Sequence, residues 1–135
     1  MKQKNSRIGL IGCGAIGSSI AKAVQDGSID GASLVALFDQ DINIAKFLSK
    51  KLNSKIVATN SFEHFMSTNG MSVVVEAASQ KAAAAYSREV VSSGKDLLIM
   101  STGSLLEESL FRDLSTLSSK TGASIFAPSG AIGGI

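Results

Sequence analysis

A glycine-rich segment near the N-terminus has the residue types and spacing that most clearly predict a chemistry. Residues 12–17 read GCGAIG, the pattern G-x-G-x-x-G, directly after the predicted strand 7–11. In this pattern the first glycine permits a tight turn, the second lets the backbone approach a pyrophosphate, and the third lets a helix pack closely on a strand. A helix that begins here also offers free N–H groups to phosphates. The alternative is an ordinary glycine turn, but the flanking pattern favours a dinucleotide cofactor. The predicted cofactor contacts in this segment are Gly12, Gly14, Ala15, Ile16 and Gly17.

Asp39 supports the same interpretation. It follows the apolar run 34–38 and lies 22 residues after Gly17, close to where an acidic residue binds the adenosine ribose hydroxyls. No Arg or Lys follows until Lys46, so nothing obvious awaits a 2′-phosphate. The sequence therefore favours NAD, with NADP possible. The alternative for Asp39 is a solvated loop carboxylate, which is what we expect Asp41 to be.

Three further segments are rich in small residues and follow predicted strands. They read EAASQ over 76–80, STGS over 101–104 and PSGAIGG over 128–134. Ligands of open parallel sheets bind outside the carboxyl ends of the strands, so these segments are candidates for the nicotinamide side. Each alone could be an ordinary turn. Their shared position at the expected ligand edge favours a function.

The remaining reactive residue types give no catalytic candidate. Cys13 could be a thiol activated by a helix N-terminus, but a small side chain packed under the turn is the favoured interpretation. His64 is expected on the surface, and Glu107 and Glu108 are expected as favourable charges in the first turn of a helix. One Cys and one His allow no internal disulfide and no structural zinc site, so no metal site is predicted.

The elements that would position these residues alternate between apolar strand-like runs and helical spacing. Two stretches have helical spacing. Ile16, Ile20, Ala23 and Val24 fall on one face of the first predicted helix, and Ile44, Phe47, Leu48 and Lys51 lie about one turn apart in the second. Such alternation with long connections predicts one doubly wound α/β domain with a parallel sheet, a Rossmann dinucleotide-binding fold over residues 1–135. The predicted strands are 7–11, 34–38, 55–58, 72–76, 97–100 and 124–126. The predicted helices are 15–26, 42–52, a short one capped by Ser61 and ending at Met66, 81–93 closed by Gly94, and 107–117.

Composition excludes several classes of protein. The 135 residues are 44% hydrophobic and 18% charged, which suits a folded domain and not a disordered segment. A net charge of +2 is too balanced for a nucleic-acid surface. No apolar run approaches the roughly 18 residues of a membrane helix. The start of the chain imitates a lipoprotein signal ending at Cys13, but its apolar part is too short, so a cytoplasmic protein is expected.

Four segments together resemble the L-aspartate dehydrogenases. They are GCGAIGSSIAKAV, VVVEAASQKA, GKDLLIMSTGSL and PSGAIGGI, and the match runs from about residue 7 to residue 135. These enzymes are NAD(P)-dependent amino-acid dehydrogenases related in fold to homoserine dehydrogenase and dihydrodipicolinate reductase. The resemblance implies oxidation of L-aspartate at its amine-bearing carbon. The product would be iminosuccinate, which hydrolyses to oxaloacetate and ammonia or feeds NAD biosynthesis.

The resemblance also implies roles for single residues. Residues 12–17 would hold the pyrophosphate and Asp39 the adenosine ribose. Ala77, Ala78 and Ser101 would line the nicotinamide side, and Ala131 matches a position that contacts the cofactor.

The family continues past this match into a second α+β domain. That domain supplies the substrate pocket, the dimer interface and a catalytic histidine, whose place His64 does not match. The sequence ends at Ile135, so we expect the chain to be the cofactor-binding part of a homodimeric enzyme and inactive alone. Two alternatives stay open: a related enzyme acting on homoserine, and a non-catalytic NAD(H)-sensing module.

Overall fold

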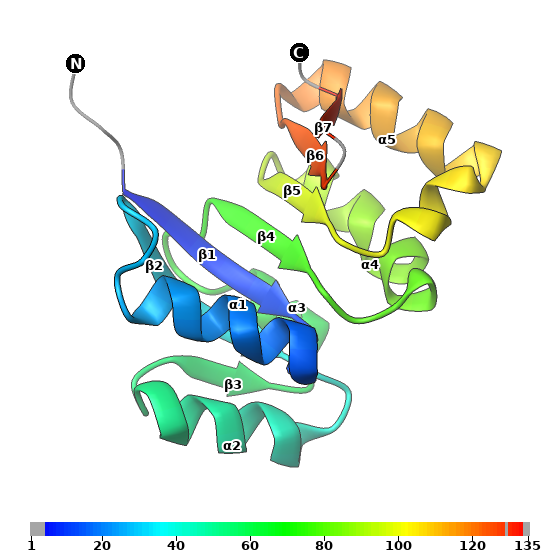
Figure 1. Cartoon of the computed structure of the whole chain (residues 1–135). Helices are drawn as coiled ribbons and strands as arrows, with labels where there is room; N and C mark the ends of the chain where they lie inside the picture. Colours follow the sequence, from blue (N-terminus) through cyan, green and yellow to red (C-terminus); the bar gives the residue numbers. More distant parts are fainter. Residues whose placement is uncertain (1–4, 129, 134–135) are drawn as a thin grey trace. The chain divides into compact units, whose positions relative to one another are not determined.

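The computed structural model describes residues 5–128 and 130–133, which form two compact units, Met1–Val73 and Val74–Ile135 (Figure 1). The predicted alternation of strands and helices is confirmed. The elements are β1 (Ser6–Ile11), α1 (Ala15–Gln25), β2 (Ala32–Phe38), α2 (Ile42–Leu52), β3 (Val57–Thr59), α3 (Phe62–Met66), β4 (Val73–Glu76), α4 (Gln80–Ser92), β5 (Asp96–Ile99), the 3₁₀ helix η1 (Thr102–Leu106), α5 (Glu108–Thr121), β6 (Ile125–Ala127) and β7 (Gly130–Gly133).

The sheet of the first unit brings the ends of three strands to one edge. β2 lies between β1 and β3 and pairs with both in parallel. In this register Ile11 lies opposite Phe38, and Phe38 lies opposite Thr59, so the three strands end at the same level. The residues that follow them, including Gly12 and Asp39, therefore meet at this edge.

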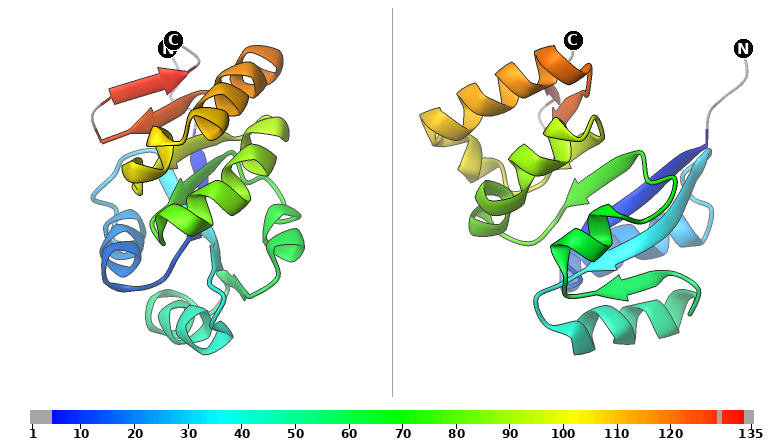
Figure 2. Two further views of the ribbon diagram at one scale, coloured as in Figure 1. Left: turned by 90° about the vertical axis from the view of Figure 1, so that its right-hand side faces the viewer. Right: turned by 180° about the vertical axis from the view of Figure 1, so that it is seen from behind.

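The helices of the first unit cover both faces of its strands. α1 and α2 contact each other, and α3 lies on the opposite face (Figure 2). Two residues of α3 contact the Phe38 ring at the end of β2. Phe62 packs edge-on against this ring, and the fully buried Phe65 lies beside it. This aromatic cluster gives the unit an apolar core directly beneath the end of β2.

The apolar residues that indicated α1 and α2 by their spacing are only partly buried. Val24 and Leu48 are buried, but Ile16 is 61% exposed and Phe47 is 69% exposed. The buried faces consist instead of Gly17, Ala21 and Val24 in α1, and of Ala45, Leu48 and Ser49 in α2. Small side chains there let each helix approach its strands closely, which turns the larger apolar residues outward.

The second unit contains a strand that was not predicted. β5 lies between β4 and β6 and pairs in parallel with β6, as expected, but β7 pairs with β6 in the antiparallel direction. Residues 128–134 were predicted as a loop after the last strand, and that prediction is wrong for Gly130–Gly133. The chain turns at Pro128 and returns along β6, with Ala131 opposite Phe126. Ser129 and Gly134 lie outside the described residues.

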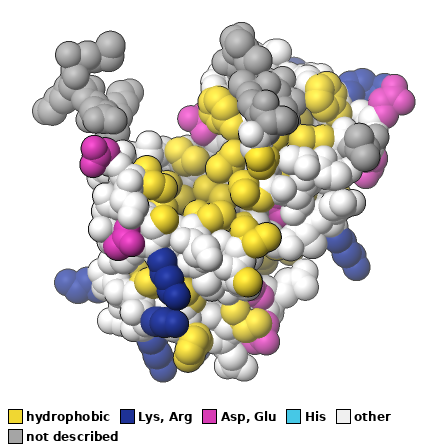
Figure 3. Space-filling model, in the orientation of Figure 1, with side chains coloured by type: hydrophobic (Ala, Val, Ile, Leu, Met, Phe, Trp, Pro, Cys, Tyr) yellow, Lys and Arg dark blue, Asp and Glu magenta, His cyan; other side chains and the backbone are white. Residues whose placement is uncertain are grey.

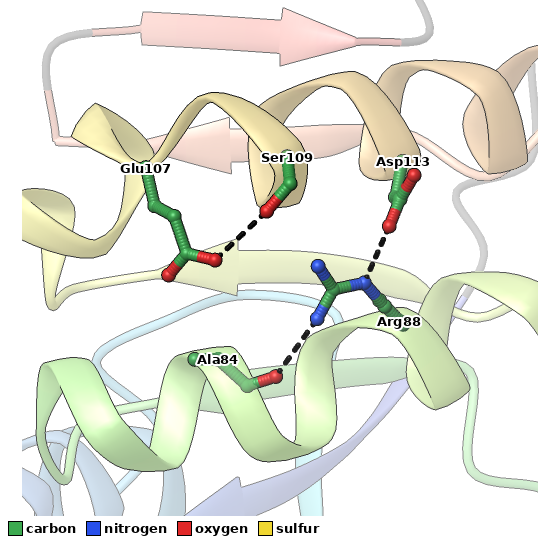
Figure 4. Close-up of polar contacts among 5 residues, drawn as sticks. All are labelled: Ala84, Arg88, Glu107, Ser109 and Asp113. Atoms are coloured by element: carbon green, nitrogen blue, oxygen red, sulfur yellow. Dashed lines mark hydrogen bonds and ion pairs between the residues drawn. The ribbon is translucent and has the colours of Figure 1, made fainter.

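Helices α4 and α5 pack against each other in the second unit. The Arg88 guanidinium links them, donating from Nε to Asp113 Oδ2 at 2.8 Å and from Nη1 to the Ala84 carbonyl at 3.3 Å (Figure 4). At the start of α5, Ser109 Oγ donates to the Glu107 carboxylate at 2.8 Å. This helix pair supports β5 and the loop that follows it.

Hydrophobic side chains are exposed at several places on the molecular surface, and Figure 3 shows one face of it. The large exposed ones are Ile16, Ile29, Ile44, Phe47, Phe111 and Phe126. Within the residues that the structure describes, no helix has the length and apolar character needed to cross a membrane.

Candidate cofactor-binding site

The turn between β1 and α1 has the geometry that its glycine pattern predicts. Gly12 adopts φ +98°, which favours glycine, and its N–H donates to the Phe38 carbonyl at 2.8 Å. A Cβ atom at Gly17 would lie 1.9 Å from the Gly12 carbonyl oxygen, so α1 and the turn touch at a point where no side chain fits. At Gly14 a Cβ would meet nothing within 4 Å. The first and third glycines are thus required by the fold, while the second borders open space.

The N-terminus of α1 has no side-chain cap. Its N-cap is Gly14, whereas Asp41, Ser61 and Ser79 cap α2, α3 and α4 with their side-chain oxygens. The first N–H groups of a helix have no acceptor inside the helix, and they carry partial positive charge. In α1 these groups begin at Ala15, next to Gly14, where a Cβ atom would meet nothing within 4 Å. This arrangement fits a phosphate group.

Asp39 is held in a fixed orientation beside the glycine turn. Its Oδ2 accepts the N–H of Cys13 at 3.0 Å, and its Oδ1 accepts the N–H of Asp41 at 2.9 Å. Each carboxylate oxygen has a second lone pair, so the group can still accept ribose hydroxyls. The structure therefore brings Asp39 and the glycine turn together. Asp41 is exposed, as expected of a solvated carboxylate, and it also caps α2 by accepting the Asn43 N–H at 3.0 Å.

Cys13 is a packed side chain with an inert thiol, as the sequence favoured. The residue is 3% exposed, and its thiol lies 3.8 Å from the Phe38 carbonyl. Burial, and secondarily the negative charge of Asp39, raises the pKa of the thiol to about 12. His64 lies exposed in α3, as predicted. Neither residue is placed to take part in chemistry at the turn.

In the second unit one residue that sequence reasoning missed organises the candidate site. Glu76 ends β4, is 1% exposed and accepts four hydrogen bonds. The donors are the N–H groups of Ala78 and Ser79, at 2.9 and 3.0 Å, and the N–H and hydroxyl of Ser101, at 2.9 and 2.7 Å. In the sequence Glu76 stood out only as the first residue of the segment EAASQ, and no role was predicted for its carboxylate.

The predicted nicotinamide contacts differ in how the structure places them. Glu76 brings Ala78 and Ser101 together, and Ala77 lies half-buried beside them. Ala131 lies in β7 and not in a strand-end loop; its side chain is outside the described part of the structure. Among the described residues there is no group of three metal-ligating side chains.

Comparison with known proteins identifies the family. A family model described as the NAD-binding domain of homoserine dehydrogenase matches residues 12–128. The chain is 41% identical over 129 residues to an L-aspartate dehydrogenase of Methanocaldococcus jannaschii and 38% identical over 130 residues to one of Nitrosopumilus maritimus. Each match covers 96% of this chain and 47% of the relative. The chain thus spans about half the length of these curated relatives.

Solved structures show the same fold at low sequence identity. The WlbA dehydrogenase of Chromobacterium violaceum, in complex with NADH and UDP-GlcNAcA, is 16% identical with a TM-score of 0.80, covering 94% of this chain and 35% of that one. The biliverdin reductase of Synechocystis sp. PCC 6803, in complex with biliverdin and NADP⁺, is 14% identical with a TM-score of 0.80, covering 92% and 38%. The predicted Rossmann fold, the predicted NAD(P) cofactor and the resemblance to L-aspartate dehydrogenases are confirmed. The chain belongs to the family of NAD-binding domains described for homoserine dehydrogenase.

Proposed function

We propose that this chain is the cofactor-binding part of an NAD(P)-dependent L-aspartate dehydrogenase. The observation that carries the proposal is the 41% identity to such an enzyme over 96% of the chain. The geometry of the turn between β1 and α1 supports cofactor binding independently, because it leaves N–H groups and open space at Gly14. We further propose that the protein acts in the cytoplasm as a homodimer.

Each candidate residue has a defined part in this proposal. The backbone of residues 12–17 binds the pyrophosphate, and the fixed carboxylate of Asp39 accepts the adenosine ribose hydroxyls. In the second unit Ala77, Ala78 and Ser101 line the nicotinamide side, and the backbone of Ala131 contacts the cofactor. The small side chains at these positions leave room for a flat ring close to the backbone.

The reaction requires more than the described residues provide. When bound, NAD⁺ would supply a hydride acceptor for the amine-bearing carbon of L-aspartate, and iminosuccinate would form once the nitrogen also loses a proton. A general acid–base group must also handle the amine proton, and it must lie within hydrogen-bonding distance of that amine. The part of the chain that the structure describes offers no clear group for this task. We propose that a second domain of the protein supplies it, together with the substrate pocket and the dimer interface.

The test is substrate-dependent reduction of NAD⁺ by the protein made from the complete reading frame that contains this sequence. L-aspartate should support formation of NADH, followed by its absorbance, and homoserine should not. A variant with the substitution Gly14→Val serves as the control for reduction that does not depend on the site.

A second candidate substrate is homoserine, because the matching family model is described for homoserine dehydrogenase. Activity with homoserine and none with L-aspartate would replace the proposed substrate. Tight binding of NADH without oxidation of either amino acid would instead support a non-catalytic NAD(H)-sensing module.

A further inference from the structure

We propose that Glu76 is a positioning residue, whose buried carboxylate joins two loops into one rigid nicotinamide-binding surface. The loops, called here the β4–α4 loop (77–79) and the β5–η1 loop (100–101), follow neighbouring strands of the second unit. The inference rests on the proposed function, which assigns Ala78 and Ser101 to the nicotinamide side.

The hydrogen bonds of Glu76 show how the two loops are joined. Oε2 accepts the N–H groups of Ala78 and Ser79 and also the hydroxyl of Ser101, at 2.7 to 3.0 Å. Oε1 accepts the N–H of Ser101 at 2.9 Å. One carboxylate therefore binds the backbone of both loops, and neither loop can shift without breaking a bond to the same group.

A carboxylate suits this position because all of its partners are donors. An ionised carboxyl group only accepts hydrogen bonds, and bonds to a charged acceptor are short and strong. Within the described residues no Lys or Arg forms an ion pair with Glu76, so its charge is balanced by N–H and O–H groups. Burying a charge is costly unless it is fully hydrogen-bonded. The four bonds provide that compensation.

Stabilising the turn between β4 and α4 does not by itself explain why a buried carboxylate stands at position 76. Helix α4 already has its own cap, since Ser79 Oγ accepts the Ala82 N–H at 3.0 Å. A cap needs no contact with the next strand, whereas two of the four bonds of Glu76 go to Ser101, 25 residues along the chain. These two bonds therefore join the β4–α4 loop to the β5–η1 loop.

A second contact supports the view that this region packs as one piece. A Cβ at Gly103, in η1, would lie 2.0 Å from Nε2 of Gln80, the first residue of α4. The Gln80 side chain therefore lies over Gly103, so the segment after β5 is in contact with the first residue of α4.

The test compares two ligands that differ only in the nicotinamide. Complete protein and its Glu76→Gln variant are titrated with NADH and with ADP-ribose, which has the adenosine, pyrophosphate and second ribose but no nicotinamide. Glutamine has about the same volume as glutamate, but its NH₂ group is a donor and would face the N–H and O–H donors that now bind the carboxylate. Since bonds to a charged acceptor are lost, NADH affinity should fall about tenfold to a hundredfold, while ADP-ribose affinity should stay within about threefold. Bound NADH should also lose part of its enhanced fluorescence.

Asp96→Asn is the matched control. The Asp96 carboxylate also accepts a backbone N–H in the second unit, from Ser124 at 2.9 Å, but it lies at the other end of β5. This variant should bind both ligands as the unchanged protein does. If it weakens NADH as selectively as Glu76→Gln does, the effect is general loosening of the unit and the inference is overturned.

Each remaining outcome is decisive. Equal weakening of both ligands, or of neither, in Glu76→Gln overturns the inference while cofactor binding stands. An unchanged protein that binds NADH no more tightly than ADP-ribose also overturns it. An unchanged protein that binds neither ligand refutes the proposed function itself. If Glu76→Gln does not fold by circular dichroism, Glu76→Asp decides, because it keeps the charge but draws the carboxylate back from both loops. That variant should weaken NADH selectively, and no selective change would overturn the inference.

Discussion

Replacing Gly14 by valine separates the role of this residue in binding from the role of the turn in folding. Gly14 adopts φ −75° and ψ −155°, a conformation open to any residue, and a Cβ there would meet no atom within 4 Å. The valine side chain would extend into the open space that the proposed phosphate occupies. The substitution should therefore abolish cofactor binding and leave the domain folded.

The size of both effects follows from the geometry. Displacing the phosphate removes at least two hydrogen bonds from N–H groups to a charged acceptor, each worth about 1.5–3 kcal/mol. The loss of about 3–6 kcal/mol corresponds to a rise in Kd of about a hundredfold to ten-thousandfold. Stability should change little, because glycine and valine at an N-cap without a side-chain bond differ by about 1 kcal/mol or less. For a domain of this size that is a change in Tm of about 4 °C.

The assay is titration with NADH, followed by its fluorescence, alongside thermal unfolding followed by circular dichroism. Gly17→Ala is the matched control, because its Cβ would lie 1.9 Å from the Gly12 carbonyl oxygen. We expect Gly17→Ala to lower the Tm clearly, since backbone must move to admit the methyl group. If Gly14→Val binds NADH as tightly as the unchanged chain, or if it unfolds as Gly17→Ala does, the reasoning about this turn is refuted.

Three further predictions concern other residues. The chain should bind NADH about tenfold or more tightly than NADPH, because the Asp39 carboxylate repels the 2′-phosphate. Asp39→Ser should reduce this preference. Titrations with both cofactors measure the ratio of the two Kd values, and an unchanged ratio would contradict the role of Asp39. Cys13 should resist iodoacetamide at pH 8 until the chain is unfolded, because burial raises the pKa of its thiol to about 12. Just above the ordinary pKa of 9.0 the thiol ionises in the unfolded chain but not in the folded one. The free energy of unfolding should therefore not depend on this thiol below pH 9, and above pH 9 it should fall by up to about 1.4 kcal/mol per pH unit. Urea unfolding of the unchanged chain and of Cys13→Ala across that range should diverge accordingly, and parallel curves would count against the raised pKa. Asp113→Asn should lower the free energy of unfolding by less than about 1 kcal/mol, because both partners of the Arg88 ion pair are half-exposed; a much larger loss would show that this pair holds α4 and α5 together.

Local signals predicted much of the fold correctly. The helix over Ile42–Leu52 was predicted with its observed ends, and Ser61 caps α3 by accepting the His64 N–H at 3.2 Å. Gly94 follows α4 with φ +85°, the conformation expected of a helix stop. Helix ends and caps depend on residues that are close together along the chain, so they can be predicted from the sequence alone.

Features that depend on distant residues were predicted less well. Periodicity indicated the two helices that hold Ile16 and Phe47 but not which side of each helix is buried. The buried sides include the small residues Gly17 and Ala21 in α1 and Ala45 and Ser49 in α2. β7 was missed because its pairing with β6 is tertiary and its residues are mostly glycine and other small types. The 3₁₀ helix after Ser101 carries no periodic pattern either.

The candidate site shows the same division. The glycine turn and Asp39 were found because their spacing along the chain reflects a recurring strand–turn–helix unit. The role of Glu76 could not be found in this way. Its partner Ser101 lies 25 residues further along the chain, and the two residues come together only because β4 and β5 are neighbours in the sheet. Asp41 is exposed, as predicted, but its role as the cap of α2 was not predicted, although the predicted start of that helix at Ile42 would have allowed it.

The burial of Cys13 makes this chain a convenient background for site-specific labelling. It is the only cysteine in the sequence and is 3% exposed, so the folded chain presents no reactive sulfur to a maleimide dye or spin label. A cysteine introduced at an exposed position, such as Ser92 at the end of α4, would be the single site of attachment. Spectroscopic reporters could therefore be placed one at a time, with the native residue left unchanged.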